Sequence, residues 1–79
     1  MKIRARLFGT LGQRFQDYNP DKGLAVEIPD GAKIKDLLVH LEISDADGVF
    51  VAVNNRVAEA DQELNEGAVV QILQRASGG

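Results

Sequence analysis

One stretch of helical period constrains the fold of this 79-residue chain more than any other feature. Its four apolar residues recur at intervals of three and four: Ile34, Leu37, Leu38 and Leu41. This spacing places them on one face of an α-helix and contradicts a strand. Residues 2–8 and 24–28, which precede it, alternate instead with the two-residue period of half-buried strands. A lone amphipathic helix among strands must bury its apolar face against them, so the sequence predicts one helix packed on one sheet.

The predicted strands differ in how they are covered. Residues 2–8 and 24–28 alternate polar and apolar side chains, as expected of strands with one face in water. Residues 49–53 are apolar throughout, which indicates a central strand with both faces covered or with one face given to a partner. Asn54-Asn55 can supply the positive φ angles of a tight hairpin, so Arg56-Val57 is predicted to return as a short edge strand before a last strand at 69–73. This order predicts an α+β fold of β-grasp (ubiquitin-like) type, in which a mixed sheet grips one main helix and Asp30 caps the helix.

Composition excludes several classes of function. The chain has no cysteine, so disulfides, thiolate nucleophiles, zinc-thiolate sites and iron–sulfur clusters are all excluded. A single small domain is too short to bury a multi-residue active site, so function is expected on the surface. The net charge of −3 argues against nucleic acid and favours basic partner proteins. No signal peptide or membrane-length stretch is seen, so we expect a cytoplasmic protein with no membrane association.

Three local patterns resemble catalytic or metal-binding motifs but lack their essential residues. Residues 9–12 lack the Lys-Ser/Thr of a phosphate-binding loop and are interpreted as a turn. Residues 45–48 begin like a calcium loop, but Arg56 stands at its twelfth position, where a ligand is needed. His40, the only histidine, falls beside the helical stripe and is expected at its rim. We therefore expect no metal site and no acid–base pair.

The chain ends in Arg75-Ala76-Ser77-Gly78-Gly79, directly after the last apolar strand. Glycine has no Cβ, so a Gly-Gly end can thread a narrow channel and present its carboxylate to another enzyme. A chance Gly-Gly end or a frayed terminus is the alternative interpretation. The predicted organisation is a β-grasp domain over residues 1–74 and a flexible tail over residues 75–79.

The order of several short motifs resembles one known family. They are Leu7-Phe8-Gly9-Thr10-Leu11, Ile28-Pro29-Asp30-Gly31, Asp36-Leu37-Leu38, Val51-Ala52-Val53-Asn54 and the Gly-Gly end. Together they resemble the MoaD/ThiS-type ubiquitin-like sulfur carriers, and most closely the small subunit of molybdopterin synthase. Many molybdopterin-type carriers have two prolines and a small apolar residue shortly before the glycines, whereas residues 74–77 here read Gln-Arg-Ala-Ser.

The resemblance implies a protein co-substrate rather than an enzyme, and it is compatible with the non-catalytic small subunit of a heteromeric synthase. An E1-like adenylyltransferase would join the Gly79 carboxylate to AMP, using its own ATP, while the carrier binds no cofactor. A persulfide-bearing protein would convert the adenylate to a thiocarboxylate, the sulfur donor for a large synthase subunit or another acceptor enzyme. Gly78 and Ser77 would thread the partner's channel.

Recognition of these partners would need a surface beyond the tail. The candidate partner-binding residues are Phe8, Val51, Leu73 and Arg75. Biosynthesis of a molybdenum or tungsten cofactor of molybdopterin type is the favoured pathway. Conjugation to lysines as a ubiquitin-like modifier, sulfur delivery to the thiazole of thiamine, and a plain interaction domain are the alternatives.

Overall fold

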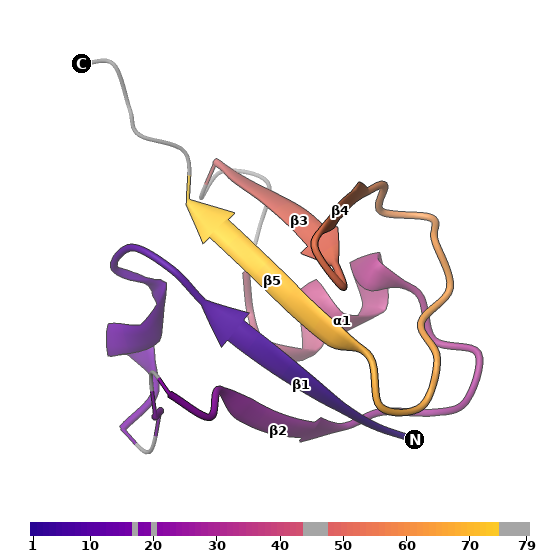
Figure 1. Cartoon of the computed structure of the whole chain (residues 1–79), viewed down its shortest axis with the longest axis horizontal. Helices are drawn as coiled ribbons and strands as arrows, with labels where there is room; N and C mark the ends of the chain where they lie inside the picture. Colours follow the sequence, from indigo (N-terminus) through magenta and orange to yellow (C-terminus); the bar gives the residue numbers. More distant parts are fainter. Residues whose placement is uncertain (17, 20, 44–47, 75–79) are drawn as a thin grey trace.

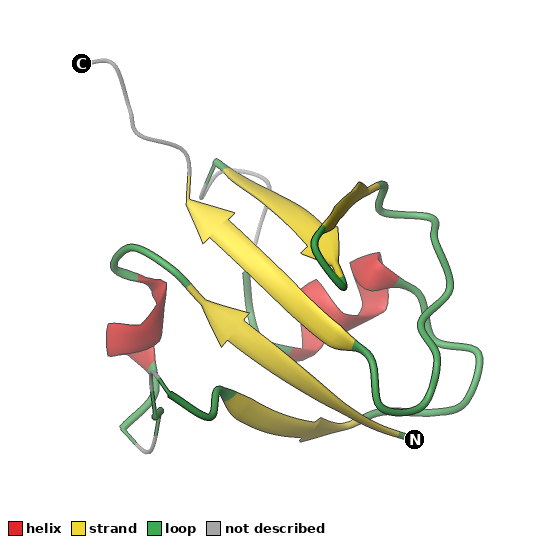
Figure 2. Ribbon diagram, viewed as in Figure 1, coloured by secondary structure: helices red, strands yellow, loops and turns green. Residues whose placement is uncertain are grey.

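The structure is a computed structural model that describes residues 1–16, 18–19, 21–43 and 48–74. Within these ranges the predicted order of elements is found, with a short 3-10 turn, η1, added after the first strand (Figure 1, Figure 2). The bounds are β1 Lys2–Leu7, η1 Leu11–Arg14, β2 Leu24–Glu27, α1 Ile34–His40, β3 Val49–Val53, β4 Arg56–Ala58 and β5 Val69–Gln74.

The strands of the described part form one mixed sheet in the order β2-β1-β5-β3-β4. The first and last strands, β1 and β5, lie side by side in its middle and run parallel (Figure 1). Every other neighbouring pair is antiparallel. This is the β-grasp arrangement that the order of elements predicts.

The core lies between α1 and the face of the sheet that α1 covers, which is the rear face in Figure 2. Leu37 of α1 is completely buried, and Ile34 and Leu41 are buried with it. From the sheet the buried side chains include Ile3, Ala5, Leu7, Val51, Val70 and Ile72. Leu38, which the helical stripe places with the core residues, is only half-buried and packs at the edge of the core.

The start of α1 differs from the prediction that Asp30 caps it. The residue before the helix is Lys33, whose backbone N–H donates to Asp36 Oδ2 at 2.9 Å. The amides of Ile34 and Lys35, which have no partner within the helix, donate to the carbonyl groups of Gln62 and Ala60, each at 3.0 Å. The loop before β5 therefore satisfies donors that a side-chain cap would otherwise satisfy.

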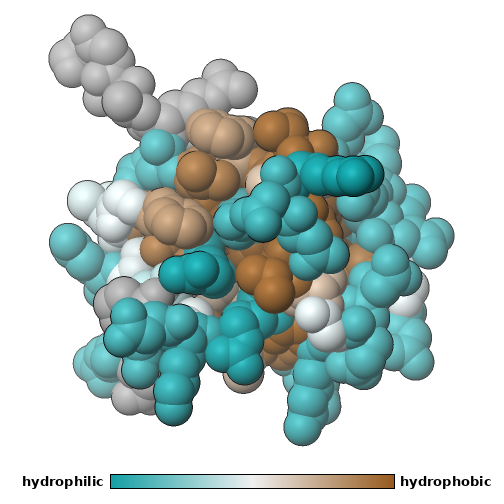
Figure 3. Space-filling model, viewed as in Figure 1, coloured by the Kyte–Doolittle hydropathy of each residue, from teal (hydrophilic) through white to brown (hydrophobic). Residues whose placement is uncertain are grey.

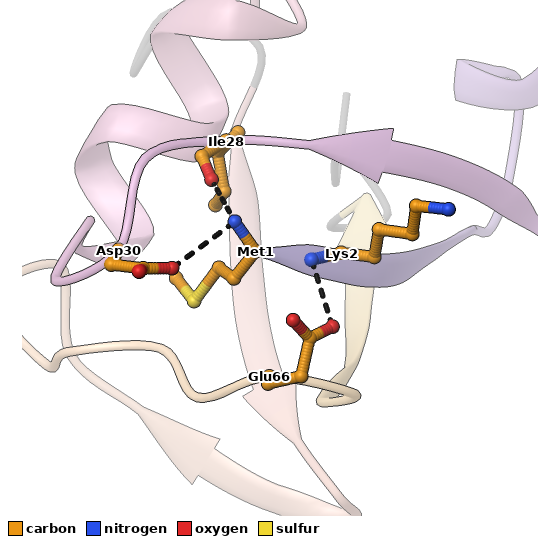
Figure 4. Close-up of polar contacts among 5 residues, drawn as sticks. All are labelled: Met1, Lys2, Ile28, Asp30 and Glu66. Atoms are coloured by element: carbon orange, nitrogen blue, oxygen red, sulfur yellow. Dashed lines mark hydrogen bonds and ion pairs between the residues drawn. The ribbon is translucent and has the colours of Figure 1, made fainter.

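Asp30 contributes instead to the start of β1 (Figure 4). The Met1 amino group lies 3.2 Å from Asp30 Oδ1 and donates to the carbonyl of Ile28 at 2.6 Å. The Lys2 amide donates to Glu66 Oε2 at 2.9 Å. These contacts tie the first residues of β1 to the segments that follow β2 and precede β5.

The predicted Asn-Asn hairpin is confirmed. Asn54 and Asn55 have φ angles of 51° and 71°, and they join β3 to the short edge strand β4. Two successive positive φ angles give a turn whose twist matches that of paired strands. The Gln71 side chain of β5 secures this turn, because it accepts from the Asn55 amide and donates to the Asn55 side chain, both at 2.9 Å.

The difference between Leu37 and Leu38 gives a test of the helix position. We expect Leu37→Ala to lower the free energy of unfolding by about 2–5 kcal/mol, because it leaves a cavity in the core. Leu38→Ala should cost clearly less, because this side chain is already half in solvent. Urea unfolding of both variants measures the difference. An equal or larger loss for Leu38→Ala would contradict the position of α1 on the sheet.

Candidate functional site

The face of the sheet that α1 leaves uncovered carries an exposed apolar patch, which consists of Phe8, Phe50, Val57 and Leu73. Phe8, Phe50 and Val57 are 38%, 37% and 78% exposed, and Leu73 is half-buried. Figure 3 shows hydrophobic residues gathered on this face, with hydrophilic residues around them. Exposed aromatic and aliphatic side chains grouped in this way are typical of protein-binding surfaces.

Strand register brings the members of the patch together. Phe50 of β3 lies opposite Leu73 of β5, and Val57 of β4 lies opposite Ala52, two residues after Phe50. The Phe8 amide donates to the Ile72 carbonyl at 3.0 Å, which continues the β1–β5 pairing by one residue and leaves Phe8 beside Leu73. Side chains two residues apart along a strand share a face, so these four residues share the uncovered face.

The prediction that Val51 belongs to the partner-binding surface is wrong. Val51 is 5% exposed and belongs to the core, because the alternation along β3 turns it toward α1 and turns Phe50 outward. The sequence could not decide this parity, since every residue of 49–53 is apolar. Phe50 was expected only as one of several residues on this strand, and Val57 only as part of an edge strand. The signal that could have identified Val57 was an apolar side chain on a short edge strand, β4, which has only three residues.

Basic side chains border the patch on the β1 side. Alternation along β1 directs Lys2, Arg4 and Arg6 to the uncovered face, and the Arg6 guanidinium carbon lies 5.8 Å from the centre of the Phe8 ring. Arg4 also donates a hydrogen bond to the Lys22 carbonyl. Glu27 of β2 lies opposite Lys2 in the register, so Arg4 and Arg6 supply the excess of positive charge beside the patch, although the net charge of the chain is −3. Basic partners, expected from the net charge, stay a prediction, while this row of cations would suit acidic groups at one side of a partner's apolar surface.

The patch lies at the edge of the sheet from which the C-terminal segment leaves. Parallel strands end at the same edge, so Phe8 after β1 and Leu73 near the end of β5 lie beside Gln74, the last described residue. Arg75, Ser77, Gly78 and Gly79 lie outside the described residues, and the division of the chain at residue 74 stays a prediction with them. Phe8 and Leu73, the two other predicted partner-binding residues, are both in the patch.

The remaining motif candidates contribute no catalytic group to this face. His40 is exposed at the end of α1, and residues 9–12 form a turn leading into η1. Asp45 and Asp47 lie outside the described residues. Within the ranges that the structure describes, no three His, Asp or Glu side chains are grouped as metal ligands would be. The candidate site is therefore the apolar patch with the basic row beside it, at the edge of the sheet where β5 ends.

The sequence as a whole matches a known family. A family model described as the ThiS family matches residues 6–79. The chain belongs to the ThiS family. This confirms the resemblance to MoaD/ThiS-type ubiquitin-like sulfur carriers that the motifs indicated. A comparison with curated proteins gave no match.

Solved structures similar to this ThiS-family chain come from three biochemical settings. SAMP1 of Haloferax volcanii, a small archaeal modifier protein, gives a TM-score of 0.75 at 18% identity, with 100% of both chains covered. The TM-score is 0.65, at 18% identity and with 100% of both chains covered, for a chain of the complex of subunits 1 and 2 of molybdopterin-converting factor from Helicobacter pylori 26695. A thiamine biosynthesis protein from Geobacter metallireducens gives 0.56 at 21% identity, covering 96% of this chain and 87% of the other. At these identities the likeness establishes the ubiquitin-like β-grasp fold.

The helices of the described ranges are short. The seven residues of α1 fall well below the roughly 20 that a helix needs to cross a bilayer, and the structure contains no membrane-spanning helix within those ranges.

Proposed function

We propose that this protein is a sulfur carrier whose Gly79 carboxylate is adenylated and converted to a thiocarboxylate. The observation that carries the proposal is the ThiS-family match, which extends from residue 6 to the Gly-Gly end. The apolar patch at the edge of the sheet from which that end leaves supports it, because it offers a partner enzyme a surface beside the reacting group. In this role the chain is a co-substrate in the cytoplasm and supplies no catalytic group.

The proposed chemistry activates a poor electrophile. The Gly79 carboxylate attacks the α-phosphate of ATP held by an E1-like adenylyltransferase, pyrophosphate leaves, and an acyl adenylate forms. The terminal sulfur of a protein persulfide then attacks the acyl carbon and expels AMP, which gives an acyl disulfide. A thiol cleaves the S–S bond of this intermediate, so that a protein disulfide forms and the thiocarboxylate is released. Gly78 and Ser77 are the small residues that pass through the partner's channel.

The patch gives the proposed carrier its affinity for these partners. A five-residue tail alone offers little area, whereas Phe8, Phe50 and Leu73 can be buried in a partner's groove. The large subunit of a molybdopterin-type synthase is the acceptor that we favour, since the motif order resembles the small subunit most closely. The complex of subunits 1 and 2 of molybdopterin-converting factor supplies a solved example of such an assembly in a protein of the same fold.

Two alternatives use the same activated end. The likeness to SAMP1 supports conjugation to lysines, and the likeness to a thiamine biosynthesis protein supports sulfur delivery to thiazole. Intact mass of the protein recovered from its own cells separates carrier from modifier. A form heavier by about 16 Da, in which sulfur replaces oxygen, is expected for the carrier, whereas covalent adducts to other proteins would indicate the modifier.

The reacting end can be tested separately from the fold. We expect deletion of Gly79 to abolish ATP–pyrophosphate exchange with the activating enzyme while leaving the melting temperature unchanged, because a residue beyond the last strand adds little to the core. Gly78→Val should have the same effect, since a β-branched side chain widens and stiffens the chain. Undiminished exchange by the Gly79-deleted protein would contradict the proposed chemistry.

The role of the patch can be tested with a matched pair of valines. Val57 of the patch and Val39 of α1 are similarly exposed, at 78% and 76%, but Val39 lies on the helix. We expect Val57→Asp to weaken binding to the adenylyltransferase by about tenfold or more and Val39→Asp to leave binding unchanged. Both variants should keep the parent stability, because neither side chain is in the core. Isothermal titration measures the affinities, and equal losses would argue against the uncovered face as the interface.

A further inference from the structure

Gln74, the last residue of β5, is held from both sides. On one side it pairs with Val49 of β3 in the antiparallel register. On the other side β1 has ended at Leu7, so no strand flanks the end of β5 there. The turn at Gly9 and Thr10 takes the place of the missing strand, although it lies 64 residues away in sequence.

Two hydrogen bonds join this turn to the Gln74 side chain. The Thr10 amide donates to Gln74 Oε1 at 3.1 Å, and the Thr10 hydroxyl donates to the same oxygen at 2.8 Å. The turn fits closely around the amide group. Gly9 has a φ of +72°, and a Cβ built on it would lie 2.8 Å from Gln74 Oε1 and 3.2 Å from Gln74 Cβ. Glycine therefore permits both the backbone angle of the turn and the approach of Gln74.

This contact contributes little to the stability of the fold. Both residues are at the surface, where hydrogen bonds exchange readily with water and contribute little net free energy to folding. The contact restricts geometry instead, because a side chain fixed at Oε1 and a backbone paired with Val49 leave Gln74 little freedom to rotate.

We propose that the Gly9–Thr10 turn clamps Gln74 and thereby sets the position and direction from which residues 75–79 leave the sheet toward a partner's active site. This inference rests on the proposed function and assigns Gln74 and Thr10 a positioning role in it. Five residues reach at most about 17 Å, so a change of direction at their origin shifts the place where the Gly79 carboxylate is delivered. The rate of the first chemical step then depends on how often the carboxylate meets ATP in the right orientation.

The sequence of the segment makes a clamp useful. Residues 74–77 contain no proline, so no ring fixes φ between the sheet and the glycines. The hydrogen-bonded side chain of Gln74 restricts the direction in which the chain leaves β5. It does so without requiring proline or any other particular residue at positions 75–77. The apolar patch is adjacent, because Leu73 directly precedes Gln74 on β5, and alternation points the two side chains to opposite faces of the sheet.

The test compares side chains of equal length with and without the acceptor oxygen. Gln74→Met removes it, and Gln74→Glu keeps an oxygen at the same reach. Gln71→Met is the control, because Gln71 of the same strand also bonds a turn through its side-chain amide, accepting from the Asn55 backbone amide and donating to Asn55 Oδ1. The kcat and KM of ATP–pyrophosphate exchange are measured for the full-length proteins with the activating enzyme, together with hydrogen exchange of the Thr10 amide.

We expect Gln74→Met to lower kcat by about three- to tenfold, because the Gly79 carboxylate reaches ATP less often in the right orientation. The KM should stay within about twofold of the parent, because the binding surface is unchanged. Gln74→Glu should restore kcat, Thr10→Val should lower it in the same direction, and Gln71→Met should leave it unchanged. The Thr10 amide should exchange faster in Gln74→Met alone of the three glutamine variants.

Each contrary outcome has its own meaning. A parent protein that supports no exchange contradicts the proposed function and with it the role of the clamp. A parent that is active and a Gln74→Met protein of equal kcat overturn the clamp alone. Equal losses in Gln74→Met and Gln71→Met would show a general effect of destabilising β5, and an unchanged Thr10 amide would show that the contact is absent in solution. Either result also overturns the clamp.

Discussion

Parallel pairing of β1 with β5 is the constraint on which the rest of the structure depends. These strands come from opposite ends of the sequence, and they pair through Arg4–Val69, Ala5–Val70, Arg6–Gln71 and Leu7–Ile72. Parallel strands need a long crossover, and here everything between them, including α1, forms that connection. Because both strands end at one edge, Phe8, the Gly9–Thr10 turn and Gln74 meet there. The site is a consequence of strand direction, since Phe8 and the Gly9–Thr10 turn come from one end of the sequence and Leu73 and Gln74 from the other.

Local signals in the sequence were sufficient for the fold and insufficient for the details of the site. The helical stripe, the Asn54-Asn55 turn and the alternation along β1 each act within a few residues, so each could be interpreted without knowing the rest of the chain. The parity of β3 depends on its register with β5, and it decided that Val51 is core and Phe50 is exposed. Capping of α1 by the carbonyls of Ala60 and Gln62 is equally remote, which is why Asp30 was the wrong choice of cap. The Thr10–Gln74 contact spans 64 residues and has no local signature.

The two faces of the sheet meet different physical requirements. The face under α1 is closed by Leu37 and its neighbours, and this core stabilises a domain that has no cysteine and therefore no disulfide. The uncovered face keeps aromatic and branched side chains in solvent, where they lower solubility and add little to stability. Such a cost is consistent with a surface that is covered when a partner binds. The basic row on β1 also belongs to this face, so its local charge differs in sign from that of the whole chain.

This separation bears on how proteins of one fold serve different pathways. In the proposed mechanism the adenylated end has the same reactivity whether a persulfide or a lysine attacks it, so the end alone cannot choose among acceptors. Discrimination must come from the surface that each partner binds and from the direction in which the end is delivered. In this chain the partner-binding surface of the proposal consists of Phe8, Phe50, Val57 and Leu73 beside a row of cations. The direction of delivery is set, in the same proposal, by Gln74 at the end of β5. A substitution at Arg6 or Gln74 would then alter the choice of partner or the rate of transfer while leaving the Gly-Gly end intact.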